Sequence, residues 1–165
     1  MAISKKRFLR AYEEYADALF RYCYFRVSDR EVAKDLLQTA FCKTWEYLVG
    51  GGKIRNFKSF LYRVAHNLVV DYYRQPKVFS LECLEEEGFD KEEDRRAPLL
   101  DKLASEEAVK RLAQLPPLYS EVLFMRYVED LTVKEIAEIL AETENVVSVR
   151  LHRGREKLRQ LFGAS

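Results

Sequence analysis

Positive charge is concentrated in one short stretch near the C-terminus. Residues 150–159 hold five basic side chains and only one acidic side chain. On a helical wheel the apolar positions of this region form one stripe: Val147, Leu151, Gly154, Leu158, Leu161 and Phe162. The other face gathers Asn145, Ser148, Val149, His152 and Arg153, and two cations flank the stripe, Arg150 and Arg155. This pattern is typical of a helix whose central residues reach base edges while its flanking cations bind phosphates.

The residues before this helix predict how it is positioned. Thr132 and Glu135 have the spacing of a capping box, which would open a short helix over 133–140. Residues 141–143 then turn the chain into a longer helix over 144–162. Two helices joined by three residues, the second of them basic, are typical of a DNA-binding helix-turn-helix.

Another helix, predicted from about residue 57 to Arg74, also has a basic outer face, and Asn56 is its expected cap. The apolar stripe consists of Phe57, Leu61, Val64, Ala65, Leu68 and Tyr72. The wheel places no acidic residue on the outer face, which carries Asn56, Ser59, Arg63, His66, Asn67, Val70 and Arg74. Tyr62 and Tyr73 fall outside the stripe, so they are candidates to stack on unpaired bases beside a cationic surface.

The helix predicted over 29–48 is apolar around more than half of its girth. Its narrow polar strip consists of Asp35, Gln38, Cys42 and Glu46, and the strip is bordered by Phe41 and Trp45. Such a strip indicates either a protein-docking surface or the thin wet edge of a central bundle helix. The residues alone favour neither interpretation. Ser28 and Glu31 have the spacing of a capping box that would begin this helix.

The rest of the chain predicts an all-α protein with two small helical domains, over 1–75 and 108–165. A first helix over 5–27 would bury one face: Phe8, Tyr12, Tyr15, Leu19, Tyr22 and Cys23. Gly50 to Gly52 end the second helix. Helical pattern returns at about 101–115 and, after Pro116 and Pro117, over 118–128.

The net charge of +1 hides a strong segregation of charge. Residues 1–75 carry 14 basic and 8 acidic side chains, residues 76–107 carry 5 and 11, and residues 108–165 carry 9 and 8. The middle segment, 76–107, is therefore expected to be an acidic linker between two domains that bind a polyanion.

Composition argues against several classes of protein. The three cysteines (Cys23, Cys42 and Cys83) lack metal-ligand spacing, so we expect buried or partly buried, inert thiols in a reducing cytoplasm. With His66 and His152 as the only histidines, no catalytic triad, cofactor site or metal cluster is expected. Apolar runs are too short to span a membrane, and the first residues lack the apolar core of a secretory signal.

Four segments, in this order and spacing, carry a family resemblance: AKDLLQTAFCKTWEYL, FKSFLYRVAHNLVVDYYR, LAQLPPLYSEVLFMRYVEDLTVKEIAEIL and VRLHRGREKLRQL. Over nearly its whole length the chain resembles the extracytoplasmic-function (group four) sigma factors of bacterial RNA polymerase. The first two segments resemble sigma region two and the last two resemble sigma region four. Residues 76–107 take the place of the linker. Ala141 stands where many relatives have Gly, a departure that bears on the geometry of the turn.

The resemblance implies a promoter-specificity subunit with no catalytic residues or cofactor of its own. Core RNA polymerase would dock on Asp35, Gln38, Phe41 and Trp45. The minus-ten promoter element would be melted and read by Arg55, Asn56, Lys58, Ser59, Arg63, Asn67, Tyr73 and Arg74. The minus-thirty-five element would be read by Thr132, Asn145, Ser148, Val149, Arg150, His152, Arg153 and Arg155. An anti-sigma protein is a further expected partner, whereas a small-molecule substrate is not.

A stand-alone helix-turn-helix regulator is the alternative function. It would account for residues 118–162. It would leave the basic face of 56–74 and the polar strip with Asp35 and Gln38 without a role.

Overall fold

The computed structural model of the protein describes residues 2–74 and 106–162, and every regular element in these ranges is helical. The all-α expectation is therefore confirmed for the described residues. The chain divides into two compact units, one ending at Arg95 and one beginning at Arg96. The predicted linker lies outside the described residues except for Glu106 and Glu107, which belong to a helix of the second unit.

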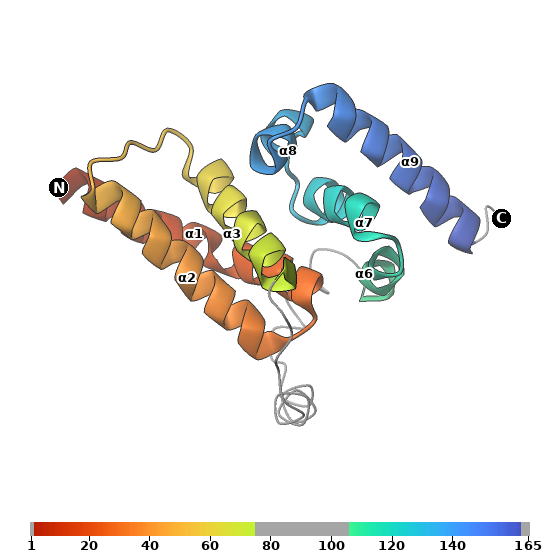
Figure 1. Ribbon diagram of the computed structural model, residues 1–165, viewed down its shortest axis with the longest axis horizontal. Coiled ribbons are helices and arrows are strands. Elements are labelled where there is room, and N and C mark those ends of the chain that lie inside the picture. Colours follow the sequence, from red (N-terminus) through yellow and green to blue (C-terminus); the bar gives the residue numbers. More distant parts are fainter. Residues whose placement is uncertain (1, 75–105, 163–165) are drawn as a thin grey trace. The chain divides into compact units, whose positions relative to one another are not determined.

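The first unit is a bundle of three helices. These are α1 (Ala2–Val27), α2 (Arg30–Val49) and α3 (Phe57–Arg74), and each packs against the other two. Figure 1 shows α2 running beside α1 in the opposite direction, with a loop leading from its far end to α3. Fully buried aromatic and aliphatic side chains form the core, among them Leu19, Phe20, Tyr22, Leu61 and Tyr62. Their removal from water supplies most of the stabilisation of such a bundle.

The junction between α1 and α2 corrects one prediction. Ser28 does not cap α2, because its backbone is left-handed (φ 55°) and its N–H donates to the Tyr24 carbonyl at 2.8 Å, which closes α1. The N-cap is Asp29, whose extended backbone lets Oδ1 accept a hydrogen bond from the Val32 N–H at 3.1 Å. An N-cap needs such an extended backbone, so the cap lies one residue after the predicted Ser28. With Asp29 as the cap, the third helical residue is Val32 and not Glu31, so the predicted capping box was wrong.

The glycine turn and the cap of α3 follow the prediction. The helix α2 ends at Val49 with Gly50 as its C-cap, and Gly51 has a φ of 95°, a backbone conformation that residues with a side chain rarely adopt. The Asn56 Oδ1 accepts a hydrogen bond from the Ser59 N–H at 3.2 Å and so caps α3.

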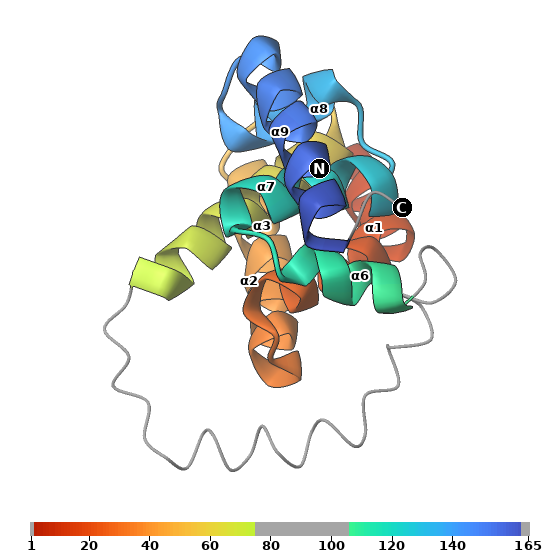
Figure 2. The same ribbon diagram turned by 90° about the vertical axis from the view of Figure 1, so that its right-hand side faces the viewer.

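The second unit contains α6 (Glu106–Ala113), α7 (Pro117–Leu123), the π-helical turn η2 (Phe124–Val128), α8 (Val133–Leu140) and α9 (Glu144–Phe162). The single helix predicted over 118–128 is therefore α7 followed by a wider turn, in which the Glu129 N–H donates to the Phe124 carbonyl at 3.1 Å. Both α7 and α8 pack against α9. Figure 2 shows α8 and the first turns of α9 together at one end of this unit.

The capping box predicted before α8 is confirmed. The Thr132 Oγ1 accepts from the Glu135 N–H at 3.1 Å, and the Glu135 carboxylate accepts from the Thr132 N–H at 2.9 Å. The predicted bounds of α8 and α9 are those of the structure. Reciprocal capping satisfies two N–H groups that have no partner inside the helix, which is why so short a helix begins sharply at Val133.

We predict that Thr132→Ala lowers the free energy of unfolding of the second unit by about 1 kcal/mol, because the cap hydrogen bond is lost. Amide hydrogen exchange of α8 in the full chain measures this loss. Thr132→Ser keeps the accepting hydroxyl and is the matched control. Equal protection of α8 in the alanine variant and the wild type would contradict the assignment of the cap.

Candidate nucleic-acid interface

The basic helix α9 is held in place by a turn and by a close approach to α7. Ala141 adopts the left-handed conformation (φ 56°, ψ 44°) that glycine takes readily, so the departure from the common Gly keeps this left-handed turn. The Thr143 Oγ1 then caps α9 by accepting from the Val146 N–H at 3.1 Å. At Gly154 an added Cβ would lie 3.0 Å from a Leu123 methyl carbon, which is closer than ordinary side-chain contacts. The absence of a side chain at Gly154 therefore lets α9 lie close on α7.

This packing leaves one face of α9 in solvent. The residues predicted to face outward are exposed: Asn145, Ser148, Val149, His152, Arg153 and Arg155. Arg150 is half-buried, and Thr132 is exposed beside its cap. Val147, Leu151 and Gly154 are buried as predicted, but Leu161 is 53% exposed. The apolar stripe thus fails in the last turn, where Leu161 stays in solvent instead of packing on the unit.

The cations of α9 differ in how their charge is compensated. Arg150 is paired with Glu142 at 3.7 Å, and Arg159 with Glu156 at 2.9 Å. Arg155 instead donates to the neutral Tyr127 hydroxyl at 3.0 Å. Within the described parts of the chain, no carboxylate forms an ion pair with Arg153 or Arg155. The positive charge of these two side chains is therefore not offset by a neighbouring carboxylate, and it remains available to attract an anionic ligand.

The outer surface of α3 is narrower than predicted. Ser59 is buried, and its hydroxyl finds no hydrogen-bond partner within the described residues. Tyr62 is also buried, with its ring centroid 5.8 Å from that of Tyr22, so it is not available to stack on a base. Both errors have one cause, because α3 is covered by α1 and α2 together and its buried arc is wider than a single apolar stripe.

The candidates that do face solvent on α3 and before it are Arg55, Asn56, Arg63, Asn67, Tyr73 and Arg74, with Lys58 half-buried. The surface is not free of acid, however. Asp71 is exposed one turn after Asn67, at the edge of the outer face that the wheel described as acid-free. The positive character of α3 is therefore strongest away from Asp71.

Tyr73 is tied to the end of α1. Its hydroxyl donates to the Arg26 carbonyl, and burial raises its pKa above the usual value while the Arg26 charge lowers it in part. Arg26 in turn donates to the Tyr22 hydroxyl at 3.0 Å, and that hydroxyl lies 3.2 Å from His66 Nδ1. This chain of contacts fixes the last turns of α1 against α3 and orients His66 on the outer surface.

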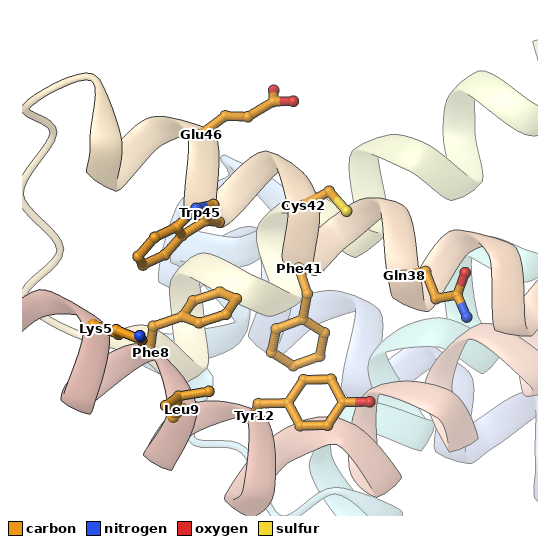
Figure 3. Close-up of a pocket in the computed structure, with 9 residues that line it drawn as sticks. All are labelled: Lys5, Phe8, Leu9, Tyr12, Gln38, Phe41, Cys42, Trp45 and Glu46. Carbon is orange, nitrogen blue, oxygen red and sulfur yellow. The ribbon is translucent and has the colours of Figure 1, made fainter.

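A second candidate surface lies between α1 and α2. Here an open groove of about 570 Å³ is lined by Lys5, Phe8, Leu9, Tyr12, Gln38, Phe41, Cys42, Trp45 and Glu46. In Figure 3 the aromatic rings from the two helices lie between α1 and α2, and Phe8 is 5.1 Å from Trp45 and 6.0 Å from Phe41 between ring centroids. An aromatic groove with a polar rim is typical of a protein-docking surface.

Of the four predicted docking residues, Gln38, Phe41 and Trp45 line this groove, whereas Asp35 lies about one turn before Gln38 on α2, outside the lining. Asp35 and Gln38 are exposed, Trp45 is half-buried, and Phe41 is buried and forms the floor under Tyr12, at 4.8 Å between ring centroids. The contribution of α1 was missed, since Phe8 and Tyr12 were assigned to its buried face. Tyr12 is 47% exposed and its neighbour Leu9 is 51% exposed. Leu9, which stands off the buried stripe predicted for that helix, was the available signal.

Other chemistry is sparse in the described ranges. No group of three or more metal-ligating side chains occurs there, and no helix there is both long enough and apolar enough to cross a bilayer. Cys23 is buried as expected, but Cys42 is exposed at the groove, which corrects the expectation of a covered thiol. Cys83 lies outside the described residues.

Comparison with known proteins shows similarity over both units. Residues 11–77 match the family described as Sigma-70 region 2, and residues 105–158 match Sigma-70, region 4. The chain is 30% identical over 156 residues to the ECF RNA polymerase sigma factor SigW of Bacillus subtilis, covering 88% of this chain and 83% of that protein. It is 28% identical to BldN of Streptomyces coelicolor over 94% of this chain, but it spans only 60% of the length of BldN.

Two solved structures share the fold. One is CnrH in complex with the cytosolic domain of CnrY, with a TM-score of 0.70 and 22% identity over 98% of this chain and 90% of that one. The other is the sigma factor RpoE of Bartonella quintana in complex with the anti-sigma factor NepR. Its TM-score is 0.66 at 18% identity, over 94% of this chain and 96% of that one.

The Glu142–Arg150 pair leads to a prediction about DNA affinity. In Glu142→Gln, Arg150 loses its acidic partner and becomes free to contact a phosphate, so we expect duplex DNA to bind up to about fivefold more tightly. The salt dependence of binding should become steeper by about one phosphate contact. Fluorescence anisotropy over a salt series measures both quantities.

Glu138→Gln is the matched control, because Glu138 is an exposed acid of α8 that has no ion pair with Arg150. If both variants tighten binding equally, the gain comes from net charge alone and the role given to Arg150 is wrong.

Proposed function

We infer that this chain, which belongs to the extracytoplasmic-function RNA polymerase sigma factors, directs core polymerase to specific promoters. The observation that carries this function is the match of both units to two regions of one sigma family, in the order region two and then region four. Each unit also presents the kind of surface that its region needs. A basic helical face lies on the second unit, and a basic face and an aromatic groove lie on the first.

The exposed face of α9 reads the minus-thirty-five element in the major groove. Its central residues, Ser148, Val149 and His152, are spaced to reach successive base edges, and Val149 offers an apolar contact for a thymine methyl group. Arg153 and Arg155 carry uncompensated charge, so they supply base or phosphate contacts. Thr132 and Asn145 border this face at the starts of α8 and α9.

The first unit binds the minus-ten element as a melted single strand. The loop before α3 supplies Arg55, and the exposed positions of α3 supply Arg63, Asn67 and Arg74. Ser59 offers no direct contact, because its side chain is buried and its N–H donates to the Asn56 Oδ1. A cationic surface of this kind follows a single-stranded backbone with little dependence on sequence, so base preference arises in the adjoining loop.

The groove between α1 and α2 docks core polymerase. Its apolar floor suits aliphatic side chains of a partner helix, while Gln38 on the rim and the exposed Asp35 one turn before it on α2 would pair with polar groups of that helix. We assign residues 1–75 to region two, 76–107 to the linker and 108–165 to region four. A stand-alone regulator is not favoured, because it would have no use for the groove.

Three further properties belong to the same proposal. The chain is a non-catalytic initiation factor, and it acts in the cytoplasm where polymerase and promoter DNA are found. An anti-sigma protein restrains it, a proposal supported by the structural neighbours CnrH and RpoE, which were solved with CnrY and with the anti-sigma factor NepR.

The function is tested by adding the purified chain to bacterial core polymerase that lacks sigma and sequencing run-off transcripts from a genomic library. Specific starts that share two upstream elements are the expected result. Tight, specific binding to duplex DNA without polymerase, together with no binding to core enzymes from several bacteria, would instead establish the stand-alone regulator.

Arg153→Ala tests how region four reads DNA. If Arg153 contacts a base, we expect the variant to lose about 1–3 kcal/mol of discrimination between the cognate and a mutated minus-thirty-five element. Competition binding with the two duplexes measures this difference. A loss that is the same on every sequence would make Arg153 a phosphate contact.

Replacing Asp35 and Gln38 together by Ala tests the docking surface. Both side chains are exposed, so the helical circular dichroism should stay unchanged while affinity for core polymerase falls on the order of tenfold. Lys43→Ala, an exposed change on α2 away from the strip, is the control. Unchanged core affinity in the double variant would remove these residues from the interface.

A further inference from the structure

The loop between α2 and α3 is held by a side chain from the first helix. Arg7 Nη2 donates a hydrogen bond to the carbonyl oxygen of Ile54 at 3.0 Å, and its guanidinium lies 4.9 Å from the centre of the Phe57 ring. Ile54 is a buried residue of the loop, and Phe57 is the first residue of α3. Arg7 therefore ties the end of the loop to α1, although 47 residues separate Arg7 from Ile54 in sequence.

The beginning of the same loop rests on an aromatic ring of α2. The Gly52 N–H donates to the Tyr47 carbonyl at 2.8 Å. A Cβ built on Gly52 would lie 2.3, 2.5 and 2.5 Å from three neighbouring carbons of the Tyr47 ring. Such similar short distances place that point over the face of the ring, so the loop backbone lies directly on Tyr47. The ring also packs on Phe60 of α3, with 5.0 Å between centroids.

These contacts restrain a loop whose three glycines would otherwise allow many backbone conformations. Gly50, Gly51 and Gly52 have the largest backbone freedom of any residues, so a loop that begins with them pays a high entropic cost when a ligand orders it. In a loop that Arg7 and Tyr47 already hold in one conformation, little further conformational entropy is lost when the ligand binds. This preorganisation raises the affinity without adding a contact to the ligand.

We propose that Arg7 and Tyr47 are positioning residues that hold the 50–56 loop in the conformation that receives the non-template single strand of the minus-ten element. This inference rests on the proposed function of the first unit. It adds to the minus-ten site two residues from helices that the sequence analysis did not connect with DNA. Figure 1 shows the loop leaving the end of α2 close to the first turns of α1.

A positioning role makes a specific prediction about electrostatics. The Arg7 guanidinium is engaged with a carbonyl oxygen and an aromatic ring, so its effect on DNA passes through the loop backbone. Removing it should weaken single-strand binding without changing the salt dependence. Loss of a direct phosphate contact would instead reduce the logarithmic salt slope by about 0.7.

The experiment compares Arg7→Ala with Lys6→Ala, which removes the same charge from the neighbouring exposed position. Each full chain is bound to core polymerase and titrated with a single-stranded oligonucleotide that carries the non-template minus-ten sequence found in the run-off transcripts. We expect binding about tenfold weaker for Arg7→Ala, since a charged hydrogen bond is lost, and little change for Lys6→Ala. Arg7→Lys keeps a donor for the Ile54 carbonyl and should recover most of the affinity.

Hydrogen exchange of the loop amides in the free chain is the second readout. Faster exchange over 50–56 in Arg7→Ala and in Tyr47→Ala, with α1 and α3 still protected, is the expected result. Unchanged exchange, or weaker binding by Arg7→Ala together with a salt slope reduced by about 0.7, would overturn the inference. If the wild-type chain starts no transcripts, that result counts against the proposed function. The exchange measurement does not depend on transcription, so it tests separately whether Arg7 and Tyr47 hold the loop.

Discussion

The close packing of α9 on α7 at Gly154 is the contact on which the second unit depends. Because no side chain stands between the helices there, Val147 and Leu151 reach the core, and Ser148 and Val149 between them face solvent. The turn at Ala141 and the caps at Thr132 and Thr143 set the angle at which α9 arrives. The surface that we propose binds DNA is thus a consequence of how the opposite face of α9 is buried.

In the first unit, too, the way the helices are buried determines which faces stay exposed, but the exposed faces are of a different kind. Its third helix is packed by two neighbours, so burial takes a wide arc of α3 and leaves a narrow basic face. Near the start of α1 the two-helix contact with α2 is incomplete, and the apolar side chains Leu9 and Tyr12 remain in solvent beside Phe41. One bundle therefore carries an exposed basic face on α3, which we propose binds nucleic acid, and an aromatic groove between α1 and α2, which we propose binds protein.

The presence of basic residues does not distinguish these surfaces, but the groups that each basic side chain contacts do. Arg150 and Arg159 each form an ion pair with a carboxylate, whereas Arg155 donates to the Tyr127 hydroxyl and has no carboxylate partner within the described residues. Arg7 is exposed, but its guanidinium donates to the carbonyl oxygen of Ile54. Basic residues that look equivalent in the sequence thus differ in what they contact, and we propose that this difference separates those that attract a polyanion from those that shape the site.

The sequence by itself determined the features that depend on near neighbours in the chain. The capping box of Thr132, the cap of Asn56, the bounds of α8 and α9 and the exposed face of α9 were all predictable, because capping and helical period act within a few residues. Tertiary structure alone decided the burial of Ser59 and Tyr62, the exposure of Tyr12 and Leu161, and the anchoring of the loop by Arg7. Each of these depends on which helix, if any, covers a given face, and a helical period cannot report contacts between residues far apart in the chain.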